Sequence, residues 1–308
     1  MKDKKTNVAV TSRSFSKNPI LRNELLKKYE NVKFNDSGLQ LQGDSLVDFL
    51  KECHKAIIAL EVINDDILRR LPRLKVISKY GVGLDMIDIQ AMNKYSVKLG
   101  WTGGVNRRSV SELVISLSIS LLRHISSSHR EVLSGVWRQH VGSQLSGKTV
   151  GIIGCGHVGK DLVRMLKPFK CNILVNDIEN FHDFHKQYNI KPVEKNELLA
   201  NSDIVTLHTP LNNTTRNMLT AEKMSLMKPS AILINLARGS LLDENALKKM
   251  LMTGKLGGAA LDVFSTEPPK DMELLELSNF IVTPHIGGSS NEAIMAMGRS
   301  SISGLEVK

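Results

Sequence analysis

The chain has 308 residues, which at about 150 residues per domain predicts two domains. Hydrophobic residues make up 42% and charged residues 23%, so a disordered chain, a collagen and a small disulfide-rich protein are excluded. The 41 basic and 31 acidic side chains give a net charge of +10, which is compatible with binding to a nucleic acid, an anionic membrane surface or a small anionic substrate. Aromatic residues are only 5%, which is few for a protein that stacks on bases.

Neither the N-terminus nor the cysteines indicate export or a membrane. No apolar stretch follows the charged N-terminus, so we expect no secretory signal. The longest apolar run, 113–122, is too short to span a bilayer and contains serines. Cys53, Cys155 and Cys171 form no CxxC pair, so we expect a reducing compartment, a cytoplasmic protein and no metal site.

Short β-branched strands alternate with amphipathic helices in two series along the chain. In the first series we expect strands at 7–11, 55–60, 74–80 and 97–101, and helices at 19–29, 45–53, 65–71 and 87–94. In the second series we expect strands at 149–153, 172–176, 204–207, 231–235, 258–262 and 280–283, helices at 157–166, 196–200, 221–227 and 244–252, and a last helix at 291–305. This alternation predicts an α/β fold with parallel sheets.

A helix that is apolar on nearly all sides is predicted near 109–125, between the two series. Ser109 and Glu112 form a capping-box pattern at its start. A helix of this kind is buried on both sides, and one side can pack on its own domain. The other side needs a partner, either a second subunit in a homodimer or the other domain of the same chain.

A glycine-rich loop follows the first strand of the second series and opens the next helix. Its three glycines have the GxGxxG spacing in the context that dinucleotide binding requires. Gly154 allows the tight turn, Gly156 lets the backbone approach a pyrophosphate, and Gly159 lets the helix pack on the strand. The start of the helix, with His157 and Val158, offers N–H groups to the phosphates.

An acidic residue stands where such folds bind the ribose. Asp177 lies eighteen residues beyond the last glycine of the loop and follows the next strand. A carboxylate there accepts hydrogen bonds from a ribose 2′-hydroxyl and repels a 2′-phosphate, so we expect NAD rather than NADP. The alternative is a glycine-rich turn without a ligand.

Three further loops each place one ionisable side chain at a strand end of the second series. Arg238 lies in NLARG, Glu267 in DVFSTEP and His285 in TPHIGG. Open parallel sheets bind their ligands at this edge. Each side chain alone could be structural, but three complementary groups at neighbouring strand ends predict a catalytic site.

With the glycine loop, these motifs resemble the NAD-dependent D-2-hydroxyacid dehydrogenase family over nearly the whole chain. The match is closest to the phosphoglycerate-dehydrogenase-like branch, without a C-terminal regulatory domain. The resemblance implies two doubly wound parallel-sheet domains. A Rossmann-type NAD-binding domain, 103–288, is inserted into a flavodoxin-like substrate-binding domain, 1–102 and 289–308. It also implies NAD as cofactor and hydride transfer at C2 of a small anionic 2-hydroxy or 2-keto acid.

The chemistry of this reaction suits the three ionisable groups. We expect His285 to exchange the hydroxyl proton, because imidazole titrates near neutral pH. Glu267 would stabilise the charged imidazole and fix its tautomer. Arg238 would grip the substrate carboxylate and polarise the C2 oxygen. The resemblance places Asp262 beside the nicotinamide, and Glu267, where the formate dehydrogenase branch has an amide, argues against formate.

The resemblance implies further contacts on both sides of the reaction. On the cofactor side it adds His208, Thr209, Pro210, Ala237 and Gly287. For the substrate it adds Lys79, Tyr80, Gly81, Val82 and Asn106.

The substrate and one alternative function stay open at this point. 3-Phosphoglycerate is one candidate, since Lys79 stands where phosphoglycerate enzymes often have a basic residue. However, Glu61 stands near the place where they offer an arginine. The alternative is an NAD(H)-sensing binding protein, like the corepressor relatives of the family, which keep the same Arg, Glu and His. We expect no nucleic-acid partner, because no recognised motif supports one, and no membrane partner.

Overall fold

The computed structural model describes residues 2–307 and divides the chain into two compact units. Unit 1 comprises Met1–Asn106 and Ser290–Lys308, and unit 2 comprises Arg107–Ser289. The chain therefore passes between the units after Asn106 and again after Ser289. The sequence placed these two crossings after residues 102 and 288.

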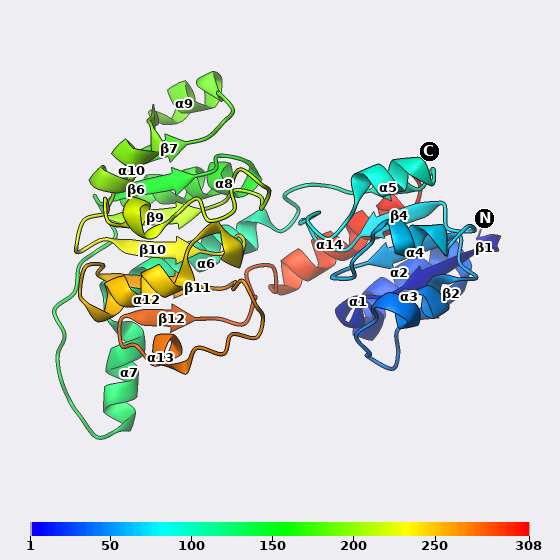
Figure 1. Cartoon of the computed structure of the whole chain (residues 1–308), viewed down its shortest axis with the longest axis horizontal. Helices are drawn as coiled ribbons and strands as arrows, with labels where there is room; N and C mark the ends of the chain where they lie inside the picture. Colours follow the sequence, from blue (N-terminus) through cyan, green and yellow to red (C-terminus); the bar gives the residue numbers. More distant parts are fainter. Residues whose placement is uncertain (1, 308) are drawn as a thin grey trace. The chain divides into compact units, whose positions relative to one another are not determined.

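Unit 1 is built on a five-stranded parallel sheet in the order β2-β1-β3-β4-β5 (Figure 1). Its strands are β1 (Asp3–Val10), β2 (Tyr29–Phe34), β3 (Lys55–Ile58), β4 (Val76–Lys79) and β5 (Lys98–Gly100). Its helices are α1 (Arg13–Lys17), α2 (Pro19–Lys28), α3 (Gly43–Leu50), α4 (Asp65–Arg69), α5 (Ile89–Lys94) and α14 (Asn291–Gly304). This strand order is the flavodoxin-like one, which confirms the predicted fold class for this unit.

Helix α14 returns to unit 1 and completes one of its two apolar clusters. Met297 and Ile302 of this helix are buried with Leu21 of α2 and Val8 of β1. The other cluster combines α3, α4 and α5. The two clusters explain why the strands are apolar on both sides, as expected for a parallel sheet covered by helices.

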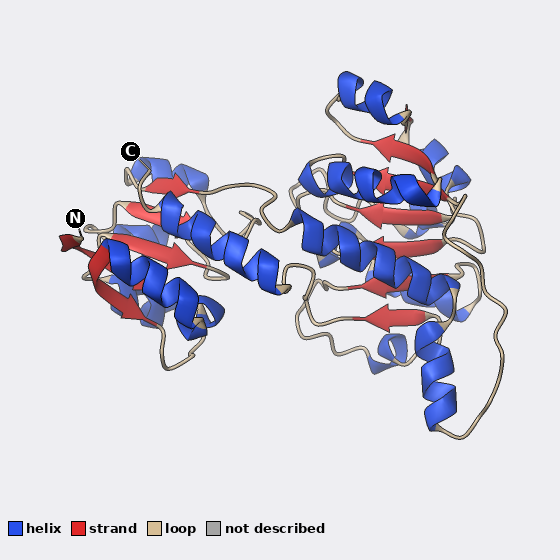
Figure 2. Ribbon diagram, turned by 180° about the vertical axis from the view of Figure 1, so that it is seen from behind, coloured by secondary structure: helices blue, strands red, loops and turns tan. Residues whose placement is uncertain are grey.

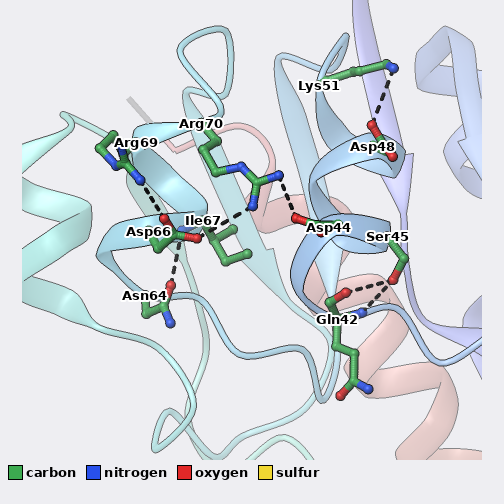
Figure 3. Close-up of polar contacts among 10 residues, drawn as sticks. All are labelled: Gln42, Asp44, Ser45, Asp48, Lys51, Asn64, Asp66, Ile67, Arg69 and Arg70. Carbon is green, nitrogen blue, oxygen red and sulfur yellow. Dashed lines mark hydrogen bonds and ion pairs between the residues drawn. The ribbon is translucent and has the colours of Figure 1, made fainter.

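Local capping fixes the ends of α3 and α4. The Asn64 side chain accepts the Ile67 amide at the start of α4. Arg70, just after α4, bridges the two helices because its guanidinium lies 2.8 Å from Asp44 and 3.6 Å from Asp66 (Figure 3). The two ion pairs of Arg70 are exposed, so they orient the helices and add little stability.

Unit 2 is built on a seven-stranded parallel sheet in the order β12-β11-β10-β9-β6-β7-β8. Its strands are β6 (Thr149–Ile153), β7 (Asn172–Asn176), β8 (Lys191–Pro192), β9 (Ile204–Leu207), β10 (Ile232–Asn235), β11 (Gly258–Leu261) and β12 (Phe280–Val282). Its α-helices are α6 (Arg107–Leu122), α7 (Ile125–Leu133), α8 (His157–Leu166), α9 (His182–Tyr188), α10 (Lys195–Asn201), α11 (Ala221–Met224), α12 (Glu244–Met252) and α13 (Met272–Leu275). Two 3-10 helices, Lys167–Phe169 and Gly239–Leu241, complete it. The order matches the Rossmann-type arrangement, with β6 between β9 and β7 and with β12 added at one edge.

Helices cover both faces of this sheet. Helices α6 and α8 lie side by side on one face (Figure 2), where their apolar residues share a cluster with β6 and β10. Helices α10, α11 and α12 contribute to the cluster on the opposite face. The strand before the glycine loop, β6, is therefore an interior strand that is covered on both faces.

The long helix predicted near 109–125 is two helices in the structure. Helix α6 ends at Leu122, and His124 adopts a left-handed conformation with φ +54 before α7 begins. The second side of α6 is half-buried and packs on the cluster of unit 2. Helix α7 has no buried residue and extends away from the sheet of unit 2 (Figure 1). Within the described residues, none of the helices has the length and hydropathy needed to cross a bilayer.

Candidate functional site

The glycine loop between β6 and α8 has the geometry that its sequence predicts. Gly154 has φ +98, and a Cβ there would lie 2.7 Å from the backbone of His208, so only glycine fits. A Cβ on Gly159 would lie 2.3 Å from the Gly154 carbonyl oxygen. Gly156 differs, because a Cβ there would meet no atom within 4 Å. The first and third glycines thus serve packing, and the second leaves space open at the start of α8.

The first turn of α8 is suited to an anion. Its N-cap, Gly156, has no side chain that could accept the first amides, so the N–H groups near His157 and Val158 are left for another acceptor. Helix N-termini carry a partial positive charge that favours phosphate. The buried residues Leu162 and Leu166 anchor the helix on the sheet. This end of α8 can therefore hold the pyrophosphate of a dinucleotide.

Asp177 follows β7 and lies directly beside the glycine loop. Its carboxylate accepts the backbone N–H of Cys155 on one oxygen and the N–H of Glu179, at 2.9 Å, on the other. These contacts fix the carboxylate at the sheet edge where a ribose would lie. Cys155 itself is fully buried, and burial raises the pKa of its thiol to about 11, so it acts as a packing residue.

His285 and Glu267 form a hydrogen-bonded pair at the ends of β12 and β11. The imidazole Nδ1 lies 2.9 Å and 3.1 Å from the two carboxylate oxygens of Glu267. Glu267 also accepts the Phe264 amide at 3.2 Å, which holds the carboxylate in place. Both side chains are partly exposed. The Glu267 carboxylate can accept a hydrogen bond from Nδ1–H, which leaves Nε2 as the atom that can exchange a proton with a ligand.

Asp262 holds the loop that carries His285. One carboxylate oxygen accepts the Thr283 hydroxyl at 2.5 Å and the Ile286 amide at 2.8 Å, and the other accepts the Gly287 amide at 2.8 Å. The Asp262 backbone oxygen accepts the His285 amide at 2.9 Å. The carboxylate is almost fully buried. In this structure the Asp262 carboxylate holds the loop that carries His285. Its place beside the nicotinamide stays a prediction.

Arg238 follows β10, the strand next to β11. Its guanidinium donates to the Ala237 carbonyl at 2.6 Å. Asn235 shapes this loop, because its side chain donates to the Arg238 carbonyl at 2.7 Å and accepts the Ala237 amide at 3.0 Å. Gly239 is required there, since a Cβ would lie 1.9 Å from the Phe264 backbone. Arg238, Glu267 and His285 therefore stand on three adjacent strand ends of one sheet.

His208 follows β9 at the same edge, with Thr209 and Pro210 after it. Its Nε2 lies 3.0 Å from the Thr206 hydroxyl. Burial lowers the pKa of His208 to about 4, so the ring is neutral at physiological pH. A neutral ring beside the glycine loop adds no charge to the predicted cofactor side.

The predicted substrate residues of unit 1 lie at the ends of its own strands. Lys79 is buried at the end of β4, where its ammonium donates to the Ala59 carbonyl and lies 3.1 Å from the Met86 sulfur. Tyr80 accepts the Ser14 hydroxyl at 3.3 Å. Gly81 has φ +128, which a residue with a side chain rarely adopts.

Two further residues of unit 1 complete the predicted substrate set. The Val82 carbonyl accepts the Trp101 indole N–H at 3.0 Å. Asn106 is buried, and no described residue donates to its amide oxygen. The contacts of Ser14 and Trp101 were not predicted, because nothing in their local sequence indicates them.

Comparison with known proteins gives consistent matches. A family model described as the D-isomer specific 2-hydroxyacid dehydrogenase, NAD binding domain, matches residues 115–287. The chain is 35% identical to D-3-phosphoglycerate dehydrogenase from Methanocaldococcus jannaschii over 90% of this chain and 54% of that relative, so it spans about half its length. It is 34% identical to hydroxypyruvate reductase from Thermotoga maritima over 89% of this chain and 90% of the relative.

A solved structure gives the same picture at the level of the fold. D-lactate dehydrogenase from Aquifex aeolicus, complexed with NAD and lactic acid, is 26% identical and superposes with a TM-score of 0.83. The match covers 96% of this chain and 93% of that one. Among the residues that the structure describes, no group of three or more His, Cys, Asp or Glu side chains is arranged to hold a metal ion.

Proposed function

Since this chain belongs to the family of D-isomer specific 2-hydroxyacid dehydrogenases, we propose that it transfers a hydride between NAD(H) and C2 of a small 2-hydroxy or 2-keto acid. The observation that supports this most strongly is the contact between His285 and Glu267, at 2.9 Å, on strand ends adjacent to that of Arg238. The pair provides a proton carrier, and Arg238 provides a cation for a carboxylate.

The proposed proton path runs through His285 Nε2. In oxidation the C2 hydroxyl loses its proton to Nε2 while the C2 hydride leaves as a pair of electrons with one hydrogen. The bound NAD supplies the acceptor for that hydride. In reduction Nε2 returns the proton to the C2 oxygen. Glu267 makes this exchange favourable, because a carboxylate next to Nδ1 stabilises the imidazolium that forms.

Arg238 would bind the substrate carboxylate. A guanidinium can donate two parallel hydrogen bonds to a carboxylate, which fixes both the position and the orientation of the acid. This orientation matters, because proximity and alignment of the reacting atoms provide a large part of the rate. The contacts of Asn235 and Gly239 support the role, since they fix the backbone from which Arg238 extends.

The residues of the glycine loop fit NAD. Gly156 leaves open space at the N-terminus of α8, and Asp177 presents a fixed carboxylate to the ribose side. A carboxylate accepts from a 2′-hydroxyl and repels a 2′-phosphate, so we propose NAD(H) rather than NADP(H) as the cofactor.

An unphosphorylated 2-keto acid is our first candidate substrate, and phosphohydroxypyruvate is the second. Glu61 lies at the end of β3, where its carboxylate accepts the Ala59 amide at 2.7 Å. Lys79 donates to the carbonyl of the same residue, Ala59. A carboxylate at this strand end repels a phosphate, and the nearby ammonium is already engaged. Relatives include an enzyme of each kind, named for hydroxypyruvate and for 3-phosphoglycerate.

A panel of 2-keto acids with NADH and NADPH, followed by absorbance at 340 nm, tests these proposals. We expect NADH-dependent reduction of at least one of glyoxylate, hydroxypyruvate, pyruvate and phosphohydroxypyruvate. The His285→Ala variant should lose about 100-fold or more in kcat with an unchanged melting temperature. NADH binding without turnover of any acid would instead support an NAD(H)-sensing protein, and full turnover by His285→Ala would refute the proton path.

We further propose that the protein forms a homodimer, with α7 and the segment after it extending the predicted α6 interface. Several apolar side chains there are strongly exposed: Leu133 is 74%, Trp137 85% and Val141 95% exposed. Ile125, Val132 and Val136 are also exposed, so the segment presents apolar side chains of the kind that protein interfaces cover. Helix α7 has no buried residue within its own chain, so we propose that a second copy of the chain covers these apolar side chains.

A further inference from the structure

The first turn of α6 contacts helix α8, whose start carries the glycine loop, through an ion pair whose carboxylate is buried. Arg108 donates from Nε and Nη2 to the two carboxylate oxygens of Asp161, each at 3.0 Å. The Ser111 hydroxyl adds a longer contact, 3.4 Å, to the Val158 carbonyl in the first turn of α8. These two contacts fix α6 against the end of α8 that carries the glycine loop.

The burial of this pair is asymmetric. Asp161 is only 3% exposed, whereas the Arg108 side chain reaches solvent. Isolating a carboxylate from water is costly, and an apolar residue at this place in α8 would pack at lower cost. A bidentate guanidinium fork fixes orientation as well as distance. The pair is therefore poorly explained by stability alone, and its geometry indicates a role in alignment.

The opposite side of the same turn contacts the loop of the proposed acid/base. A Cβ built on Gly287 would lie 3.6 Å from the Val110 side chain and 3.1 Å from the Asp262 carboxylate. Asp262 in turn accepts the amides that follow His285. The first turn of α6 thus lies between the phosphate-binding helix and the loop of His285, and both belong to unit 2.

We propose that Arg108 and Asp161 are positioning residues for hydride transfer. Their ion pair holds the first turn of α6, and through it the His285 loop, at a fixed place relative to the end of α8 that would bind the dinucleotide phosphates. This inference rests on the proposed dehydrogenase activity. Misplacement of reacting groups by about 1 Å can cost about 100-fold in rate, so loss of the pair should slow the chemical step more than it weakens cofactor binding.

The test uses a double variant, Arg108→Met with Asp161→Leu, which replaces the pair by apolar side chains and leaves no buried charge unpaired. Arg108→Lys is the second variant, because it keeps a cation and loses the fork. The matched control is Arg123→Met, an exposed arginine just beyond the other end of α6. For each protein we would measure the melting temperature, the NADH dissociation constant, kcat, and the primary isotope effect on kcat with NADH deuterated at the transferred position of C4.

We expect the double variant to melt near the wild type and to bind NADH within about threefold of it. Its kcat should fall about tenfold or more, and its isotope effect should rise as hydride transfer becomes rate-limiting. Arg108→Lys should show the same changes to a smaller extent, and Arg123→Met none. If either variant keeps the wild-type melting temperature, kcat and isotope effect, the inference is wrong and the pair is only structural. If the double variant fails to fold, Arg108→Lys decides by the same criteria. An inactive wild type would instead refute the proposed function.

Discussion

Two glycines of the same loop should respond to alanine in different ways. In Gly156→Ala the added methyl meets no protein atom within 4 Å, but the backbone there, with φ −74 and ψ −143, lies outside the regions that alanine favours. We therefore expect the free protein to lose about 1 kcal/mol of stability to backbone strain, without a steric clash. The methyl enters the space where the pyrophosphate is expected, so NADH affinity should fall about tenfold or more, which corresponds to about 1.4 kcal/mol or more.

In Gly159→Ala the added methyl lies 2.3 Å from the Gly154 carbonyl oxygen and 3.3 Å from a methyl of Ile152. An ordinary contact between a methyl and an oxygen needs roughly 1 Å more, so α8 must shift away from the turn, and overpacking of this size costs about 1–3 kcal/mol. We therefore expect Gly159→Ala to lower the free energy of unfolding of the apo protein by that amount.

Urea unfolding of the apo proteins and fluorescence titration with NADH separate the two effects. The expected pattern is a small loss of stability with weak NADH binding for Gly156→Ala, and a larger loss of stability for Gly159→Ala. A loss in Gly156→Ala as large as that in Gly159→Ala would contradict the open space at Gly156. Wild-type NADH affinity in Gly156→Ala would show that the pyrophosphate does not approach this residue.

Three further outcomes follow from burial and exposure. Because the pKa of His208 falls from 6.5 to about 4 on folding, the unfolded chain takes up a proton first as the pH drops. The free energy of unfolding should therefore decrease by about 2 kcal/mol between pH 7.5 and 5. In His208→Gln, urea unfolding at the two pH values should show a decrease that is smaller by this amount. The pKa of Cys155 is raised to about 11, so at pH 8 we expect its thiol to react with a thiol reagent at least about 100-fold more slowly than a free thiol does. Peptide mapping of the labelled protein measures this rate, and rapid labelling would contradict the burial of Cys155. Replacing Leu133 and Trp137 by serine should convert the proposed dimer to a monomer in light scattering, and an unchanged mass would place the interface elsewhere.

Elements with a strong local pattern could be predicted from the sequence. The strands at 149–153, 172–176 and 204–207 and the helices at 157–166 and 244–252 have the predicted bounds. Each of these strands is a short apolar run that ends at a turn, and each helix shows clear amphipathic spacing.

The elements that were missed lack such a local signal. β2 (Tyr29–Phe34) has mostly exposed and half-buried residues at the sheet edge, and it follows α2 without a turn. The predicted helix 19–29 includes its first residue, and no strand is predicted for the rest. β8 has only two residues, and it pairs with β7 at one edge of the seven-stranded sheet of unit 2. Edge strands depend on the neighbour that they pair with, and one sequence does not reveal that neighbour.

The candidate site shows the same division between local and non-local information. The glycine loop could be predicted because its turn, its amides and its packing all depend on a few consecutive residues. The contact of His285 with Glu267 spans eighteen residues, so no local pattern predicts it, and in the sequence the resemblance to a known family indicates it. The pair of Arg108 and Asp161 spans 53 residues and belongs to no motif, so only the packing of α6 on α8 reveals it.

The backbone at His285 adopts a conformation that is unfavourable for a residue with a side chain. His285 has φ +56, a left-handed conformation that costs a residue with a side chain about 1–2 kcal/mol. The surrounding loop compensates, because Asp262 accepts the Thr283 hydroxyl and the amides of Ile286 and Gly287. Glycine or asparagine would adopt this conformation at lower cost, so stability does not explain why a histidine stands at this position. Strain that the neighbouring residues hold in place is typical of functional sites, and here it turns the imidazole toward Glu267. Asp262 therefore contributes to the proposed reaction through the loop it holds, before any role beside the cofactor is considered.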